Sequence, residues 1–303
     1  MRVALIVVLS LALSGCAIWR KDAEEPVENT GPVKEKAEPA ARSSDAPKPS
    51  DVLKPKSLEI ASPSTDKFYI RFIYFPAAVT TDIQLDASPT VPGTLLSGED
   101  DLGLDDKVDQ ARMEVNMRMS RRHNLHLDYF KLDRFSQQPL PRDIAFGDFT
   151  FPEGTIFRTK LNWRVFTLTH TYSFVQGERF EAGIGLGIHI IEAKAEGMEP
   201  GTNNREASSE VGIFPTLNGI ASYRISKRWA ASARALWFSA APDEFDGTMA
   251  EYHGDVQFRW HKNAAVGLGY TKLITKLQVF DASDPLLFNL DTSGPELFVR
   301  FSF

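Results

Sequence analysis

The sequence predicts an all-β protein whose main part, residues 67–303, closes into an antiparallel up-and-down barrel that crosses a membrane. Three observations support this fold class. Segments of about ten residues alternate between apolar and polar side chains, which is the period of a strand and not of a helix. Their polar face is rich in Arg, Glu and Asp, too charged for an ordinary core. Short polar turns alternate with longer loops, an asymmetry typical of membrane barrels.

Composition limits the alternatives. The chain has 303 residues and a formal net charge of -6, which argues against a nucleic-acid partner. No apolar run after the N-terminus is long enough for a transmembrane helix. Cys16 is the single cysteine, so an intramolecular disulfide is impossible.

The N-terminus has the pattern of a secretory signal. A positive start, Met1-Arg2, precedes an apolar segment that ends in Leu13-Ser14-Gly15-Cys16. This tetrapeptide resembles the lipobox of bacterial lipoproteins. The resemblance implies that residues 1–15 are removed and that Cys16 is acylated, with palmitate among the attached chains. Residue Ala17 is not the aspartate that retains such proteins in the inner membrane, so the lipoprotein-sorting machinery would deliver the chain to the outer membrane. The alternative is an ordinary signal peptide with a chance cysteine.

Residues 16–66 are expected to form the acylated cysteine and a disordered periplasmic linker. Mixed charges and a scarcity of aromatic residues leave too little apolar surface to order this segment. Seven of the 18 prolines lie in it: Pro26, Pro32, Pro39, Pro47, Pro49, Pro55 and Pro63. A passive spacer is favoured over a peptidoglycan or partner contact.

The first half of the barrel is expected to contain a strand over residues 67–74, a hairpin over 110–132 and a strand from Thr155. Pro76 is expected to end the first strand, because proline cannot donate to a ladder. Large polar loops are expected over 77–107 and 135–154. In the strand from Thr155 the apolar parity reverses after Arg164, which we interpret as a β-bulge near Arg164-Val165.

The second half continues with strands over 180–189, 211–224, 229–237, 251–260, 264–270 and 296–303, and with loops over 197–207, 242–247 and 281–294. Three inward glycines in 180–189 predict that a bulky group packs there, with the opposite arginines as candidates. Pro215 does not suit a strand with two neighbours, so a bulge or a break is expected. The tally is about ten strands, with eight as the alternative.

The last segment, Leu297-Phe298-Val299-Arg300-Phe301-Ser302-Phe303, resembles the C-terminal signature of bacterial outer-membrane barrels. With the alternation over 67–303, the chain resembles the small OmpA/OmpW/OmpX-type barrel superfamily. The resemblance implies that the barrel assembly machinery recognises Phe303. It also implies a location in the outer membrane, contact with outer-membrane lipids and lipopolysaccharide, a monomer, and no cofactor.

The inward parity predicts a plugged or very narrow lumen, because a barrel of this size is just wide enough to be filled by its side chains. We expect a network of paired charges to close it. Its predicted members are Arg71, Arg112, Glu114, Arg118, His126, Asp128, Arg158, Arg164, Arg234, Glu251, His253, Asp255, Arg259 and Arg300.

Two groups of residues suggest chemistry. The pairs His126-x-Asp128 and His253-x-Asp255 have the residue types of a general base, but paired interior charges explain them better. An acidic loop offers oxygen ligands for a divalent cation, although a solvated loop is favoured and no metal site is predicted. Its weak candidates are Asp100, Asp101, Asp105 and Asp106.

The sequence therefore favours a lipid-anchored outer-membrane barrel with a non-enzymatic role in envelope structure, surface interaction or narrow-specificity transport. Alternatives are an outer-membrane lipid A hydrolase or protease, a small channel, and a soluble periplasmic lipoprotein. The last would be lipocalin-like, with its apolar face inside the barrel.

Overall fold

A computed structural model describes residues 66–303, apart from residues 89, 203, 242–244 and 281–284. The predicted signal peptide, Cys16 and the linker lie outside the described residues. The described part contains no helix long and apolar enough to cross a membrane.

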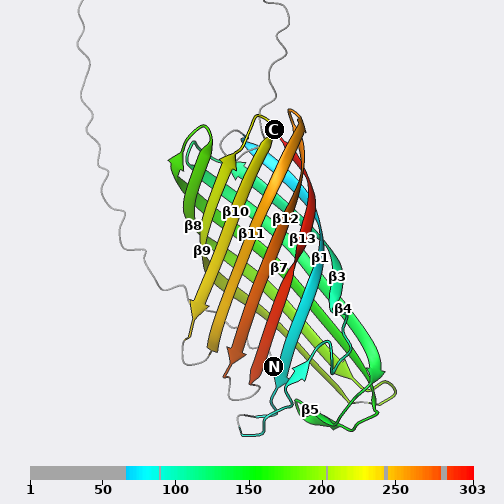
Figure 1. Ribbon diagram of the computed structural model, residues 1–303. Coiled ribbons are helices and arrows are strands. Elements are labelled where there is room, and N and C mark those ends of the chain that lie inside the picture. Colours follow the sequence, from blue (N-terminus) through cyan, green and yellow to red (C-terminus); the bar gives the residue numbers. More distant parts are fainter. Residues whose placement is uncertain (1–65, 89, 203, 242–244, 281–284) are drawn as a thin grey trace, which may run out of the picture. The chain divides into compact units, whose positions relative to one another are not determined.

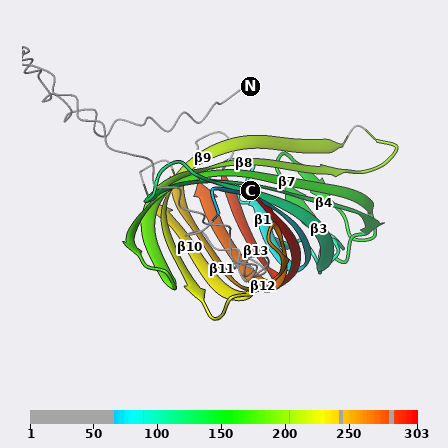
Figure 2. The ribbon, with the colours of Figure 1, turned by 90° about the horizontal axis from the view of Figure 1, so that it is seen from above.

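The ten long strands of the described part form one closed antiparallel barrel, which confirms the predicted fold class (Figures 1 and 2). Each pairs with the next in chain order, and the last pairs with the first. The strands are β1 (Phe68–Leu85), β3 (Lys107–Arg118), β4 (His123–Pro139), β7 (Ile156–Gln176), β8 (Phe180–Met198), β9 (Arg205–Arg224), β10 (Trp229–Ala240), β11 (Phe245–His261), β12 (Ala264–Val279) and β13 (Leu286–Ser302).

The two ends of the barrel differ. Four short connections, residues 119–122, 177–179, 225–228 and 262–263, lie at the end where the chain reaches Phe303 (Figure 1). We call this the turn end. The longer connections lie at the opposite, loop end, and they include the short strands β2 (Leu96–Ser97), β5 (Ile144–Phe146) and β6 (Phe149–Phe151).

The apolar face of the strands changes side between the two ends. In β7, Phe166 and Tyr172 point outward near the turn end, while Thr167 faces the interior and is buried. Nearer the loop end, Trp163 is buried inside and Arg164 points outward. The outside of the barrel is therefore apolar in its turn-end half and polar in its loop-end half.

Aromatic side chains mark both edges of the outward apolar band. On β8 the band runs from Phe180 to Ile190, and ten steps of about 3.3 Å at a tilt of about 40° give a height of about 25 Å. This is the height of the lipid-facing band of outer-membrane barrels. The loop-side edge carries Tyr74, Tyr129, Phe166, Trp237, Tyr252 and Tyr270, and the turn-side edge carries Phe180, Tyr223, Trp229, Trp260 and Phe301, all of them exposed.

Several predicted strand boundaries were wrong. Pro76 does not end β1, which continues to Leu85, and the predicted loop over 281–294 is mostly part of β13. The predicted loops over 77–107 and 135–154 contain the ends of β1 and β4 and the short strands β2, β5 and β6. The alternation was interpreted as if each strand had one environment along its whole length. Several strand segments that extend beyond the apolar band were therefore predicted to be loops.

The predicted bulge at Arg164-Val165 is also wrong. Pairing of β7 with β4 and β8 is continuous there, and the one irregularity in its register with β8 falls between Ser173 and Val175. The change of parity reflects the change of surroundings described above. Strand β9 likewise runs through Pro215, which is opposite Ile188 of β8. Pairing of β9 with β10 stops at Leu217. The part of β9 on the loop-end side of Leu217, which includes Pro215, is therefore not paired with β10, and such an edge tolerates proline.

The inward glycines of β8 pack against β7 and not against arginines. A Cβ built on Gly185 would lie 2.0 Å from the backbone oxygen of His170, and one on Gly187 would lie 2.8 Å from the Thr169 hydroxyl. These glycines let β8 lie close to the backbone and threonines of β7.

The loop-end half of the interior is an apolar core. Leu132 and Leu290 are completely buried, and the ring of Trp163 stacks on Phe288 with centroids 5.1 Å apart. Above this layer, the loops at the mouth are joined by a bond of 2.8 Å from the Thr94 amide to the Ala145 oxygen. Their buried side chains close the mouth with an apolar cap: Leu96, Leu102, Leu104, Ile144, Phe146 and Phe151.

Candidate functional site

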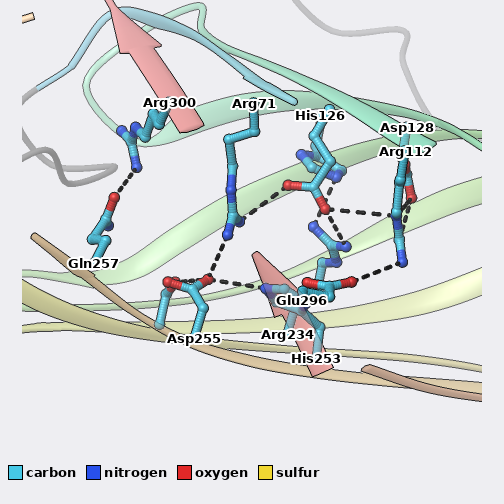
Figure 3. Close-up of polar contacts among 12 residues, drawn as sticks. Arg71, Arg112, His126, Asp128, Arg234, His253, Asp255, Gln257, Glu296 and Arg300 are labelled. Atoms are coloured by element: carbon cyan, nitrogen blue, oxygen red, sulfur yellow. Dashed lines mark hydrogen bonds and ion pairs between the residues drawn. The ribbon is translucent and has the colours of Figure 1, made fainter. Parts of the chain in front are cut away.

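Charged and polar side chains fill the turn-end half of the interior. Figure 3 shows the polar contacts among several of them. They occupy the inward parity of strands whose outward parity is apolar. Twelve of the predicted network residues lie inside the barrel: Arg71, Arg112, Glu114, Arg118, His126, Asp128, Arg234, Glu251, His253, Asp255, Arg259 and Arg300.

Glu114 lies at the centre of this network. Its carboxylate is inaccessible to solvent and accepts a hydrogen bond of 3.1 Å from Arg71 Nη1 and one of 2.9 Å from Arg234 Nη2. Arg71 also donates to Asp255 at 3.1 Å, so one guanidinium joins β1 to both β3 and β11. The network therefore crosses the lumen and connects strands on opposite sides of the barrel.

Arg112 forms a second crossing. It donates through Nε to Asp128 of β4 at 2.9 Å, and it also pairs with Glu251 of β11. Arg234 Nη1 lies 2.8 Å from His126 Nε2. Glu114, His126 and Asp128 are spaced closely enough to hold a metal ion. Arginines already contact all three, however, and their positive charges oppose a bound cation.

The second predicted histidine and acid pair is in contact. His253 Nε2 lies 2.9 Å from Asp255 Oδ2, and its Nδ1 lies 3.1 Å from Glu296 Oε2. The Ser232 hydroxyl donates to the same Asp255 oxygen at 2.6 Å. The carboxylate therefore lies between the serine and the histidine, whereas a nucleophilic triad needs the imidazole next to the hydroxyl. The arrangement is that of a buried polar network.

Nearer the turn end, Asp66 binds two arginines. Its carboxylate accepts hydrogen bonds of 2.9 Å from Arg259 and 2.6 Å from Arg300, and the Arg300 guanidinium stacks 3.7 Å above the Tyr69 ring. Sequence reasoning assigned Asp66 to the linker and missed this contact. Its only signal was an acidic residue directly before the first strand.

Other partners were also missed. Glu181 accepts two bonds of 2.9 Å from Arg118, and Glu296 is buried against His253. Both have the inward parity, which is the signal that places them in the interior. Their absence from the predicted network left Arg118 and His253 without a complete set of partners.

Two predicted lumen residues were wrong. Arg158 donates to Gln137 at 2.9 Å, and Arg164 pairs with Glu192 at 3.1 Å, all on the outside of the loop-end half. The error follows from the supposed bulge, which reversed the inward parity. Because the strand is continuous, Leu161, Trp163 and Val165 take the inward positions instead.

The acidic loop is not gathered around a common point in the described part of the chain. Asp101 pairs with Arg142 at 2.8 Å and accepts a bond from the Ser97 amide, whereas Asp100, Asp105 and Asp106 are exposed to solvent. The hydrogen bond from Arg142 lowers the pKa of Asp101, and partial burial opposes this effect. The loop is held to the cap by an ion pair.

No protein-family model matches the chain, and no curated protein matches its sequence. Solved structures with a similar barrel include the outer membrane protease OmpT from Escherichia coli. The two sequences are 9% identical, and the structural match covers 80% of this chain and 99% of the protease, with a TM-score of 0.48. The outer membrane protein OprG from Pseudomonas aeruginosa is 11% identical, covers 81% and 100%, and gives 0.35. Ail of Yersinia pestis is 10% identical, covers 75% and 98%, and gives 0.30. These likenesses concern architecture alone.

Proposed function

We propose that the protein is an outer-membrane β-barrel with a non-enzymatic role, in which a filled and rigid barrel supports the envelope and carries a surface for interaction. The observation that carries the proposal is the filled interior. Buried side chains occupy it at successive heights, from Arg300 and Glu114 to Trp163 and the cap residue Leu96. A barrel packed in this way supports a plugged lumen over a diffusion pore.

The outside of the barrel supports a place in the outer membrane. An apolar band of about 25 Å with aromatic edges suits the hydrocarbon layer, and short turns normally face the periplasm. In this orientation the loop-end half stands above the membrane. Its polar outside and apolar inside form a capped extension that suits contact with surface lipopolysaccharide or another partner.

The N-terminal part of the proposal concerns anchoring. Acylation of Cys16 would add a lipid anchor, and residues 17–66 would tether it to the barrel in the periplasm. The lipoprotein-sorting and barrel assembly machineries would deliver and insert the chain, the latter through the signature that ends in Phe303. The barrel would act as a monomer.

The first test is conductance in planar lipid bilayers. Purified full-chain protein, checked for folding by its heat-modifiable migration on gels, should give no stable channel openings. An open ten-strand porin-like lumen would produce steady single-channel steps, and that result would overturn the proposal. The same gel comparison with Cys16→Ala separates the barrel from its anchor. Both forms should shift on boiling, whereas release of the variant into the soluble periplasm without a shift would contradict the membrane barrel.

A further inference from the structure

The turn end of the barrel carries a collar of exposed cationic side chains. Within the described residues, none of its members takes part in an ion pair, and Glu178 is the one exposed acidic side chain on these turns. The members of this cationic collar are Lys67, Arg121, Arg122, Arg179, Lys227, Arg228 and Lys262.

The collar lies directly against the aromatic edge of the apolar band. Arg228 immediately precedes Trp229, Arg179 precedes Phe180, and Lys262 follows Trp260 by two residues. Aromatic rings of this kind lie at the boundary between hydrocarbon and headgroups. The collar is therefore at the height of the lipid phosphates. The acidic loop at the opposite end shows that this charge is not a general property of the barrel.

One sector of the collar reaches into the apolar band. Arg122 Nη1 donates to the Tyr172 hydroxyl at 2.9 Å, and next to it His123 Nδ1 lies 3.0 Å from His170 Nε2. The two imidazole rings stack with centroids 5.2 Å apart. His170 is exposed on the outward face of β7, among residues that face lipid. Together with Arg121, these groups form a polar site at the edge of the hydrocarbon.

We propose that the cationic collar binds the phosphate groups of anionic phospholipids in the inner leaflet, and that Arg121, Arg122, His123 and His170 form its strongest site. The inference rests on the proposed function, because it requires the turn end to face the periplasm. A phospholipid matches the surface in two ways, since its phosphate pairs with the cations while its acyl chains cover the adjoining apolar strands. A soluble polyanion would reach the turns but would leave the outward imidazole of His170 uncovered.

The test measures which lipids stay with the protein. Full-chain protein is reconstituted in vesicles of phosphatidylcholine and phosphatidylglycerol, extracted in mild detergent, and its retained lipids are identified by native mass spectrometry. Phosphatidylglycerol should be enriched over its share in the vesicle. The double variant Arg121→Gln/Arg122→Gln should lower that enrichment by about fivefold or more, since each basic side chain at a membrane surface attracts anionic lipid.

Two further variants sharpen the result. The variant Lys160→Gln/Lys276→Gln removes the same charge from exposed positions on β7 and β12, each six residues beyond the loop-side aromatic edge at Phe166 or Tyr270, and it should leave the enrichment unchanged. The variant His170→Leu keeps an apolar contact with lipid but removes the imidazole, and it should lower the enrichment without changing any arginine. Equal losses in the collar variant and the Lys160→Gln/Lys276→Gln variant would show that only net charge matters, which would overturn the inference.

The remaining outcomes separate the inference from the proposed function. Folded, heat-modifiable protein that shows no preference for phosphatidylglycerol would overturn the inference and leave the barrel proposal intact. Failure to insert into vesicles at all would overturn the barrel proposal. Binding to purified peptidoglycan that is lost in Arg121→Gln/Arg122→Gln, with lipid retention unchanged, would assign the collar to the cell-wall polymer and overturn the lipid site.

Discussion

Pro76 of β1 lies opposite Pro295 of β13, at the seam where the barrel closes. The paired positions on either side are Tyr74 with Leu297 and Ala78 with Ser293, and the ladder is interrupted between them. A proline has no N–H to donate, so neither strand can complete the ladder at this point. The two backbones are nevertheless in contact, because a Cβ built on Gly294 would lie 2.3 Å from the Pro76 oxygen. The ladder between β1 and β13 is therefore interrupted at Pro76 and Pro295, but the seam is not open there.

The first prediction concerns this seam. The double variant Pro76→Val/Pro295→Val supplies two backbone donors and a residue type that favours strands, and should stabilise the barrel by about 1 kcal/mol for each bond regained. Urea unfolding followed by tryptophan fluorescence in detergent measures the change. The exposed loop variant Pro141→Val is the control and should change little. Lower stability in the double variant would mean that the prolines set a bend that the seam requires.

The second prediction concerns the centre of the charged network. Glu114→Ala leaves Arg71 and Arg234 buried without their shared carboxylate, and loss of one partner of a buried ion pair costs about 3–5 kcal/mol. The temperature at which unboiled protein loses its folded gel band should therefore fall sharply. Asp133→Ala, which breaks the exposed pair with Lys131, should cost less than about 1 kcal/mol. Similar effects of the two substitutions would contradict a central role for Glu114.

The third prediction compares two glycines in neighbouring strands. Gly185→Ala places a Cβ against the backbone of β7 and should destabilise the barrel, because a backbone atom cannot move aside as a flexible side chain does. Gly219→Ala meets no atom within 4 Å and should be neutral or slightly stabilising, since alanine restricts the unfolded chain more than glycine. Urea unfolding of the two variants gives the comparison. Equal stabilities would show that β8 can move away from β7 without cost.

The two glycines also show what sequence could predict. Alternation on β8 predicted which residues face inward, but the inward glycines were wrongly interpreted as room for a bulky group such as an arginine. The pattern could not show that the approaching group is the backbone of β7, because strand spacing depends on how the whole barrel curves. Parity was reliable wherever a strand has one environment along its length, as in Gln110 to Met119 of the β3 region. It was misinterpreted at Arg164, where the surroundings of the strand change from apolar to polar.

The sequence also predicted which charged residues face the interior but not which of them pair with one another. Arg71, Glu114 and Asp255 were predicted to face inward from their own strands alone. Their contacts join β1, β3 and β11, which are distant in sequence, so only the closed barrel defines the pairs. Asp66 was missed because it precedes the alternating pattern, although it accepts bonds from Arg259 and Arg300.

The fourth prediction concerns pH and the loop that carries Asp101. Arg142 lowers the pKa of Asp101 from its ordinary value of 3.8, so the ion pair stabilises the docked loop above that value and is lost as the pH falls through the lower, folded value. Hydrogen exchange of residues 97–104 should therefore be faster in Arg142→Gln than in the wild type above about pH 5, and the difference should shrink as the pH falls below 3.8. A difference that persists at the lowest pH would show that Arg142 acts by packing and not through the Asp101 charge.

The fifth prediction compares the two layers of the filled interior, which are the upper, apolar layer in the loop-end half and the lower, charged layer in the turn-end half. Trp163 is buried and stacked on Phe288, so Trp163→Ala removes a large apolar side chain from the upper layer and should cost about 3–5 kcal/mol. Phe135→Ala, at an exposed position on β4, is the control and should stay within about 0.5 kcal/mol of the wild type. Folded Trp163→Ala should still give no conductance in planar bilayers, because the arginine and carboxylate network below it remains intact. Steady channels in this variant would instead show that the apolar layer alone closes the barrel and that the charged half is permeable to water and ions.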